Sequence, residues 1–110
     1  MSGAVGVNAS HINGVYTPSG LILNRGSMFK KTDGSLKWLW RQSKGAWVIS
    51  EEKDIDANDA ECWCRSEDFD LTDPLQVKTW KSLDDLGNFL VQPELTAVRH
   101  VKEVSCKHNV

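Results

Sequence analysis

Residues 36–50, which contain three of the five tryptophans, constrain the possible folds more than any other part of the chain. Bulky side chains alternate with polar ones on both sides of Lys44 and Gly45, a pattern typical of two half-buried β-strands joined by a tight turn. Pairing Gln42 with Trp47 sets the register of the predicted hairpin. The large side chains expected on one face are then Trp38, Trp40, Trp47 and Ile49. A slip of one residue would move Trp47 to the other face.

The rest of the chain repeats short apolar runs between Gly, Pro, Asn and Asp residues, with turn signals roughly every 8 to 12 residues. No segment has a helical period long enough for a crossover between parallel strands. We therefore predict an all-β fold, a small antiparallel sandwich or barrel of roughly seven to nine short strands with at most one short helical turn. The further strands are expected near residues 12–16, 21–23, 27–31, 60–65, 75–80, 88–92 and 95–101. The turns include residues 17–20 and 32–35, and residues 82–86 are expected to form a turn or a short helix.

The 110 residues are enough for one domain with its own core. Residues 1–10 are small and polar and show no sustained periodicity, so we expect a disordered tail there. The β domain is predicted to span residues 11–101, and residues 102–110 are expected to be a second frayed or disordered tail.

Composition narrows the classes of partner. Hydrophobic residues make up 40% of the chain, and the 13 basic and 15 acidic residues give a net charge of −2. This balance provides no basic field for nucleic acid or anionic lipid, so we expect neither partner. The beginning of the sequence has no basic and apolar signal segment, and three cysteines cannot all pair. We therefore expect a monomer in the cytoplasm or another reducing intracellular compartment.

Three cysteines and a histidine form a possible zinc set: Cys62, Cys64, Cys106 and His108. Three thiolates and one imidazole are a valid tetrahedral combination, but structural zinc sites usually place two or more residues between paired cysteines. We therefore expect no metal and no cofactor. A strand in which Cys62 and Cys64 share one face, with Trp63 on the other, accounts for the same residues.

Catalysis has little support in the sequence. The three histidines are His11, His100 and His108, and no motif pairs any of them with a cysteine and an orienting carboxylate. We expect that the protein is not an enzyme. A cysteine-dependent enzyme is a third alternative.

Tryptophans are the candidate binding residues. Trp38 and Trp40 lie among basic residues, as in proteins that bind single-stranded nucleic acid, but the predicted register puts Lys37 on the opposite face and favours a core role. Trp63 and Trp80 flank the acidic loop that ends at Pro74, and we expect them to be exposed. The predicted binding residues are Trp63, Trp80, Trp38 and Trp40.

A progression of short motifs runs over residues 11–98. The motifs are I-N-G-V-Y at residues 12–16, N-R-G with F-K-K at residues 24–31, W-L at residues 38–39, G-A-W-V-I at residues 45–49, and Pro74 followed by Trp80. The progression resembles that of short all-β modules of protist proteins, which carry N-G-x-Y, N-G-R-x-x-Y/F-x-K, W-x-I and D-x-P-x-x-x-x-W. The N-R-G order departs from the usual N-G-R. The resemblance implies an interaction role without catalytic residues, because such modules occur alone or beside other domains.

The sequence thus leads to a non-enzymatic, intracellular module that docks a protein or peptide through an exposed strand edge or an aromatic patch. The alternative is a β-barrel that binds a small ligand in a cavity lined by Trp38, Trp40 and Trp47. The third is a cysteine-dependent enzyme with a single low-pKa thiol.

Overall fold

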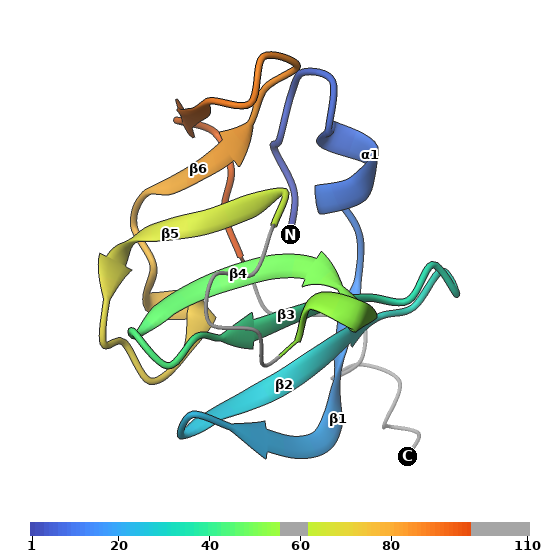
Figure 1. Cartoon of the computed structure of the whole chain (residues 1–110), viewed down its shortest axis with the longest axis vertical. Helices are drawn as coiled ribbons and strands as arrows, with labels where there is room; N and C mark the ends of the chain where they lie inside the picture. Colours follow the sequence, from blue (N-terminus) through green and yellow to red (C-terminus); the bar gives the residue numbers. More distant parts are fainter. Residues whose placement is uncertain (56–61, 98–110) are drawn as a thin grey trace, which may run out of the picture.

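The computed structural model describes residues 1–55 and 62–97. Within these two ranges seven strands form one antiparallel sheet, and each strand pairs with the next one in the sequence. Figure 1 shows the strands following one another from β1 at one end of the molecule to β6 at the other. The predicted all-β, antiparallel fold of short strands is confirmed. It is an open meander with β1 and β7 at its two edges, and not a closed barrel.

The strands are β1 (Tyr16–Leu23), β2 (Gly26–Lys31), β3 (Lys37–Arg41), β4 (Ala46–Glu51), β5 (Cys64–Phe69), β6 (Trp80–Leu83) and β7 (Phe89–Gln92). The same part of the chain contains one α-helical turn, α1 (Ala9–Ile12), and two 3₁₀ turns, η1 (Glu52–Asp54) and η2 (Pro74–Gln76). In the residues that the structure describes, no helix is long and apolar enough to cross a membrane.

The predicted register of the tryptophan hairpin is wrong by one residue. Arg41, and not Gln42, lies opposite Trp47. The turn has three residues instead of two: the N–H of Gln42 donates to the carbonyl of Ala46, the N–H of Gly45 donates to the carbonyl of Gln42, and Gly45 has a φ of 100°. A three-residue turn that ends in a glycine with positive φ is a common hairpin connection, and its extra residue shifts the pairing by one.

The shifted register puts large side chains on both faces of the central hairpin. Cluster 1 contains the buried residues Ala4, Ile12, Leu39, Trp47, Ile49, Cys64, Val77, Trp80 and Leu95. Cluster 2, on the other face, contains Met28, Trp38, Trp40, Val48 and Cys62. The centre of the sheet is therefore covered on both sides, although the sheet has a single layer.

The expectation of a disordered tail over residues 1–10 is wrong, because this segment completes cluster 1. Ala4 is buried, and Ser2 and Thr96 exchange two backbone hydrogen bonds of 3.0 and 3.1 Å. The Lys31 ammonium, itself buried, donates to the carbonyl of Ser10 at 2.8 Å. Figure 1 shows this blue N-terminal segment and α1 beside β6. The small side chains of this segment allow it to pack on the sheet. Its lack of periodicity therefore does not indicate disorder.

Two other sequence predictions change in the first half of the chain, and a third is confirmed. Residues 12–16 do not form a strand of their own, because α1 includes Ile12 and β1 begins at Tyr16. The predicted turn at residues 17–20 lies inside β1, where the register shifts between Pro18 and Ile22 as in a β-bulge. The hairpin predicted for residues 21–31 is confirmed, with Asn24 and Arg25 forming its two-residue turn at φ values of 52° and 64°.

The second half differs where proline and aspartate shape the chain. The strand predicted at residues 75–80 is wrong, because Asp73 caps η2, Pro74 starts it, and β6 begins only at Trp80. The predicted strand at residues 88–92 is confirmed as β7. Thr96 makes one isolated bridge with Ser2, while residues 98–101 of the predicted last strand and the predicted tail at 102–110 lie outside the described residues.

Candidate functional site

Three of the four predicted binding tryptophans are core residues. Trp38 and Trp40 are buried in cluster 2, and Trp80 is fully buried in cluster 1, so the expectation that Trp80 is exposed is wrong. Trp80 lies opposite Ser66 on β5, on the face that the N-terminal segment covers. The sequence pattern predicts that the N-terminal segment lies outside the fold, and for that reason it also predicts that Trp80 is exposed.

The tryptophans do not line a common cavity. Trp38 and Trp40 lie on the face opposite Trp47, and the sheet passes between them. Their indole N–H groups are used within the core: Trp40 donates to Ser50 Oγ at 2.8 Å, and Trp47 donates to the carbonyl of Leu71 at 2.9 Å. The arrangement that a tryptophan-lined barrel requires is therefore not formed by these three residues.

Trp63 is the one predicted binding residue with a partly open side chain. It lies just before β5, where its ring stacks on the imidazole of His11 with centroids 4.5 Å apart. The ammonium of Lys37 lies 5.4 Å from the ring centroid. Burial lowers the pKa of His11, and the nearby ammonium groups of Lys37 and Lys31 lower it further. Trp63 thus joins α1 to the sheet as well as facing solvent.

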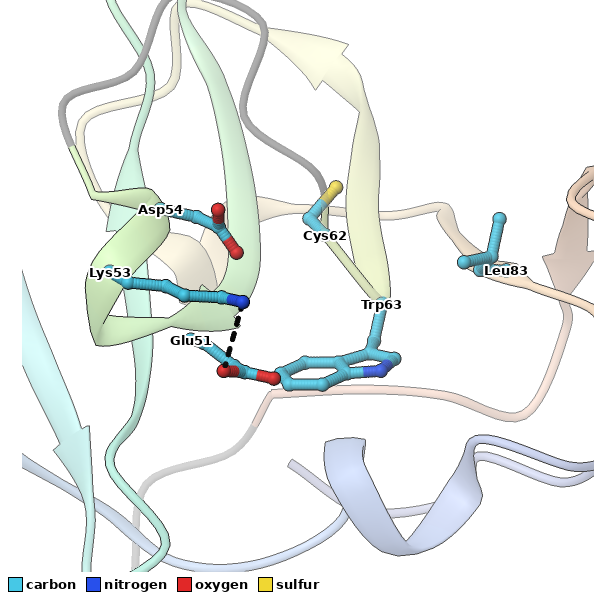
Figure 2. A pocket seen from close by; sticks show the side chains of 6 residues that line it. All are labelled: Glu51, Lys53, Asp54, Cys62, Trp63 and Leu83. Carbon is cyan, nitrogen blue, oxygen red and sulfur yellow. Dashed lines mark ion pairs between the residues drawn. The ribbon is translucent and has the colours of Figure 1, made fainter.

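A pocket of about 260 Å³ opens next to Trp63. Its lining residues are Glu51, Lys53, Asp54, Cys62, Trp63 and Leu83. Figure 2 shows the Lys53 side chain between those of Asp54 and Glu51, beside the edge of the Trp63 ring. The ammonium pairs with Glu51 at 4.0 Å. Lys53 thus pairs with the acidic lining of the pocket and Lys37 already lies over the Trp63 ring, so the protein's own cations fill the roles that a cationic ligand would take, which makes the pocket a poor candidate for a ligand site.

The cysteines are buried on opposite faces. Cys62 belongs to cluster 2 and Cys64 to cluster 1, so the prediction that they share one face is wrong. The chain bends at Trp63, and strand alternation starts only at Cys64. Burial raises the pKa of the Cys62 thiol to about 11 and that of Cys64 further. Within the described ranges no three potential metal ligands gather, and Cys106 and His108 lie outside those ranges.

The edge strand β7 has the most open recognition surface that we find in the described ranges. Asp84 and Asn88 close the β6–β7 turn through a bond from the Asp84 N–H to the Asn88 carbonyl of 2.8 Å. Because bonded and non-bonded pairs alternate in an antiparallel ladder, Leu90 and Gln92 direct their backbone groups to β6. Phe89 and Val91 direct theirs outward. Among the residues that the structure describes, these outward N–H and C=O groups have no partner.

Side chains on β7 add apolar surface to this edge. Leu90 is 54% exposed and Val91 is 52% exposed, on opposite faces of the sheet. Next to Leu90 on the same face, the Gln92 side chain accepts from the N–H of Val5 at 3.1 Å and donates to its carbonyl at 3.0 Å. Val5 is also exposed. An added strand would therefore find apolar side chains on both faces.

The sequence did predict β7 as a strand, but not as an edge. An uncharged Phe-Leu-Val-Gln run that stops at Pro93 was the available signal. Its meaning depends on the strand order, which local patterns do not give. Comparisons of the chain with models of protein families, with curated proteins and with solved structures found no match.

Proposed function

We propose that this protein is a non-enzymatic interaction module that binds an extended peptide segment of another protein as an added strand on β7. The proposal is carried by one observation. The backbone groups of Phe89 and Val91 point outward from an edge strand on which the side chains of Leu90 and Val91 are half exposed. Main-chain hydrogen bonds give affinity in this mode of recognition, and alternate side chains give specificity. The all-β modules of protist proteins that the sequence resembles fit such a role.

The opposite edge of the sheet is less suited to docking. β1 contains Pro18, and a bulge interrupts its pairing between Pro18 and Ile22. Proline and bulges are devices by which natural edge strands avoid pairing with other chains. Within its four residues β7 has neither device and no charged residue. Of the two edges of the sheet, β1 is therefore protected against pairing with another chain, and β7 is open to it.

Binding without catalysis agrees with the state of the thiols. Both Cys62 and Cys64 are buried, and their raised pKa values keep them protonated at neutral pH, so neither is an activated nucleophile. A net charge of −2 favours a protein segment over nucleic acid as the partner. In the proposal the protein acts inside a reducing compartment, where these thiols stay reduced.

The test uses Val91→Pro. The Val91 N–H points outward and takes no part in the bonds to β6, so proline removes one docking donor and leaves the native ladder intact. Ile22→Pro is the matched control, because Ile22 is next to the Leu23–Gly26 pair that closes the β1–β2 turn and also directs its N–H outward. Ile22→Pro thus removes one outward N–H from the protected edge strand β1.

A library of short displayed peptides is selected on the wild-type protein, and the enriched peptides are measured on both variants. We expect them to bind the Ile22→Pro protein normally and to lose most of their affinity for the Val91→Pro protein. Peptides that bind all three proteins equally would show that β7 is not the docking edge.

A further inference from the structure

We infer that β7 selects a partner strand with an apolar centre and basic residues at both ends, and that the same charges prevent β7 from pairing with a second copy of this chain. The inference rests on the proposed function. It follows from where the carboxylates lie relative to β7. Residues 88–93 carry no charge, whereas Asp84 and Asp85 precede them and Glu94 follows them.

Both ends of the edge carry negative charge, and at one end a carboxylate is held by hydrogen bonds. Asp84 Oδ1 accepts hydrogen bonds from the N–H groups of Leu86 and Asn88, at 2.9 and 2.8 Å, so this carboxylate is fixed at the β6–β7 turn. Asp85 beside it is exposed. At the other end Glu94 is also exposed, and its backbone packs against Gly3, which leaves no space for a Cβ there. Both ends of β7 are thus acidic, with the Asp84 carboxylate and the backbone of Glu94 held in place.

Two cations of the described residues lie beside β7. Lys81 lies opposite Val91, one strand inward, and its ammonium pairs with Glu67 at 3.3 Å. The guanidinium of Arg65 lies 4.4 Å from the centroid of the Phe89 ring, over its face. Lys81 is thus next to the third residue of β7 and Arg65 next to its first, and in the described part of the chain neither makes an ion pair with Asp84, Asp85 or Glu94.

Self-pairing through β7 brings like charges together in either direction. An antiparallel pair of β7 strands places Glu94 of one copy beside the turn that carries Asp84 and Asp85 of the other. A parallel pair places the same ends side by side. Like charges opposite each other destabilise strand pairs, and these contacts would lie within the screening length of roughly 8 Å at physiological salt.

The same geometry favours a basic partner. Because both ends of β7 are acidic, a strand with Lys or Arg on each side of an apolar centre gains favourable contacts in either orientation. The main-chain bonds and the contacts with Leu90 and Val91 come from the centre of that strand. The acidic ends therefore favour pairing of β7 with a basic strand of another protein over pairing with the β7 of a second copy.

Three synthetic peptides separate the charge inference from the docking proposal: KKVTVTKK, SSVTVTSS and EEVTVTEE, each with a fluorescent label. Fluorescence anisotropy measures their affinities at low and high salt. We expect the lysine peptide to bind roughly 10-fold more tightly than the serine peptide at low salt, and the glutamate peptide to bind least. The difference should shrink at high salt.

The double variant Asp85→Lys with Glu94→Lys changes two exposed side chains and keeps Asp84 in its turn, so it should fold normally. On this variant the order of the lysine and glutamate peptides should reverse. Equal affinities of the three peptides for the wild-type protein would overturn the charge inference and leave docking on β7 intact. A lysine peptide that binds the Val91→Pro protein as tightly as the wild type would overturn docking on β7 itself.

Sedimentation of the wild-type protein tests the second half of the inference. We expect a monomer at all concentrations. A wild-type dimer that Val91→Pro dissociates would show that β7 pairs with itself and would overturn the inference.

Discussion

The backbone N–H of Asp70 donates a hydrogen bond of 3.0 Å to the carbonyl of Gly45, which fixes the β3–β4 turn against the end of β5. A second turn of the same kind closes β6 and β7, where the N–H of Gly87 donates to the carbonyl of Asp84 and Gly87 has a φ of 85°. The two glycines have the same role in the backbone but different surroundings. A Cβ at Gly45 would collide with Asp70, whereas a Cβ at Gly87 meets nothing within 4 Å.

This pair separates backbone strain from steric collision. Gly87→Ala should cost about 1–2 kcal/mol of the free energy of unfolding, the cost of a left-handed conformation with a side chain. Gly45→Ala should cost about 1–3 kcal/mol more, because Asp70 must also move. Urea unfolding of both variants measures the difference. Equal losses would mean that Asp70 moves aside freely.

The hairpin that contains Gly45 also shows what the sequence could predict. The alternation of bulky and polar residues gave two strands and their approximate ends, because burial of a sheet imposes a period of two. The register depended on whether Lys44 and Gly45 formed the whole turn. Ser43 belongs to it too, and this single residue moved Trp47 to the other face of the sheet.

Other errors came from contacts between distant parts of the chain. Residues 1–10 have no periodicity, and only their contacts with Thr96 and with the buried Lys31 show that they belong to the domain. Trp80 was predicted to be exposed for the same reason, since its cover is supplied by that segment. Local patterns predict strands, but the layer that covers them and the strand at the edge follow from topology.

A second prediction concerns the buried indoles. The Nε1–H of Trp80 is buried and has no hydrogen-bond partner among the described residues, whereas the Nε1–H of Trp40 donates to Ser50 Oγ at 2.8 Å. Replacement by phenylalanine removes a similar volume at both sites, but it removes an unsatisfied donor at one and a satisfied donor at the other. Trp40→Phe should therefore destabilise the protein by about 1–3 kcal/mol more than Trp80→Phe. Chemical denaturation provides the comparison, and a larger loss for Trp80→Phe would contradict it.

A third prediction follows from the lowered pKa of His11. Burial is the main cause, followed by the ammonium groups of Lys37 and Lys31, while Glu51 partly opposes them. Between this lowered value and the ordinary 6.5 the unfolded chain binds more protons than the folded chain. The free energy of unfolding should therefore fall as the pH is lowered through that window, and the stabilisation is fully present above 6.5.

His11→Phe is the control for this pH dependence, because phenylalanine keeps a ring on Trp63 but cannot bind a proton. The difference in unfolding free energy between wild type and variant, measured from about pH 8 to about pH 5, isolates His11 from the other histidines. A difference that does not change with pH would refute the assignment.

A fourth prediction concerns the thiols. With a pKa of about 11, Cys62 is a thiolate in only on the order of one molecule in a thousand at pH 8. Cys64 is more deeply buried and its pKa is raised further. In a Cys106→Ser variant, thiol reagents should therefore modify the native protein slowly, Cys62 before Cys64, and both rapidly in denaturant. Fast modification of either residue in the native state would restore the cysteine-dependent enzyme as an alternative.

The last prediction tests the β7 edge without any partner. Amide hydrogens of Leu90 and Gln92 point to β6, while those of Phe89 and Val91 point outward. Hydrogen exchange followed by NMR should therefore alternate along the strand, with the inward amides roughly 100-fold or more slower than the outward ones. The four residues share one strand and one local stability, so each inward amide is the control for its neighbours. Slow exchange at Val91 in the free protein would mean that another group already covers the edge, and β7 would not be available for docking.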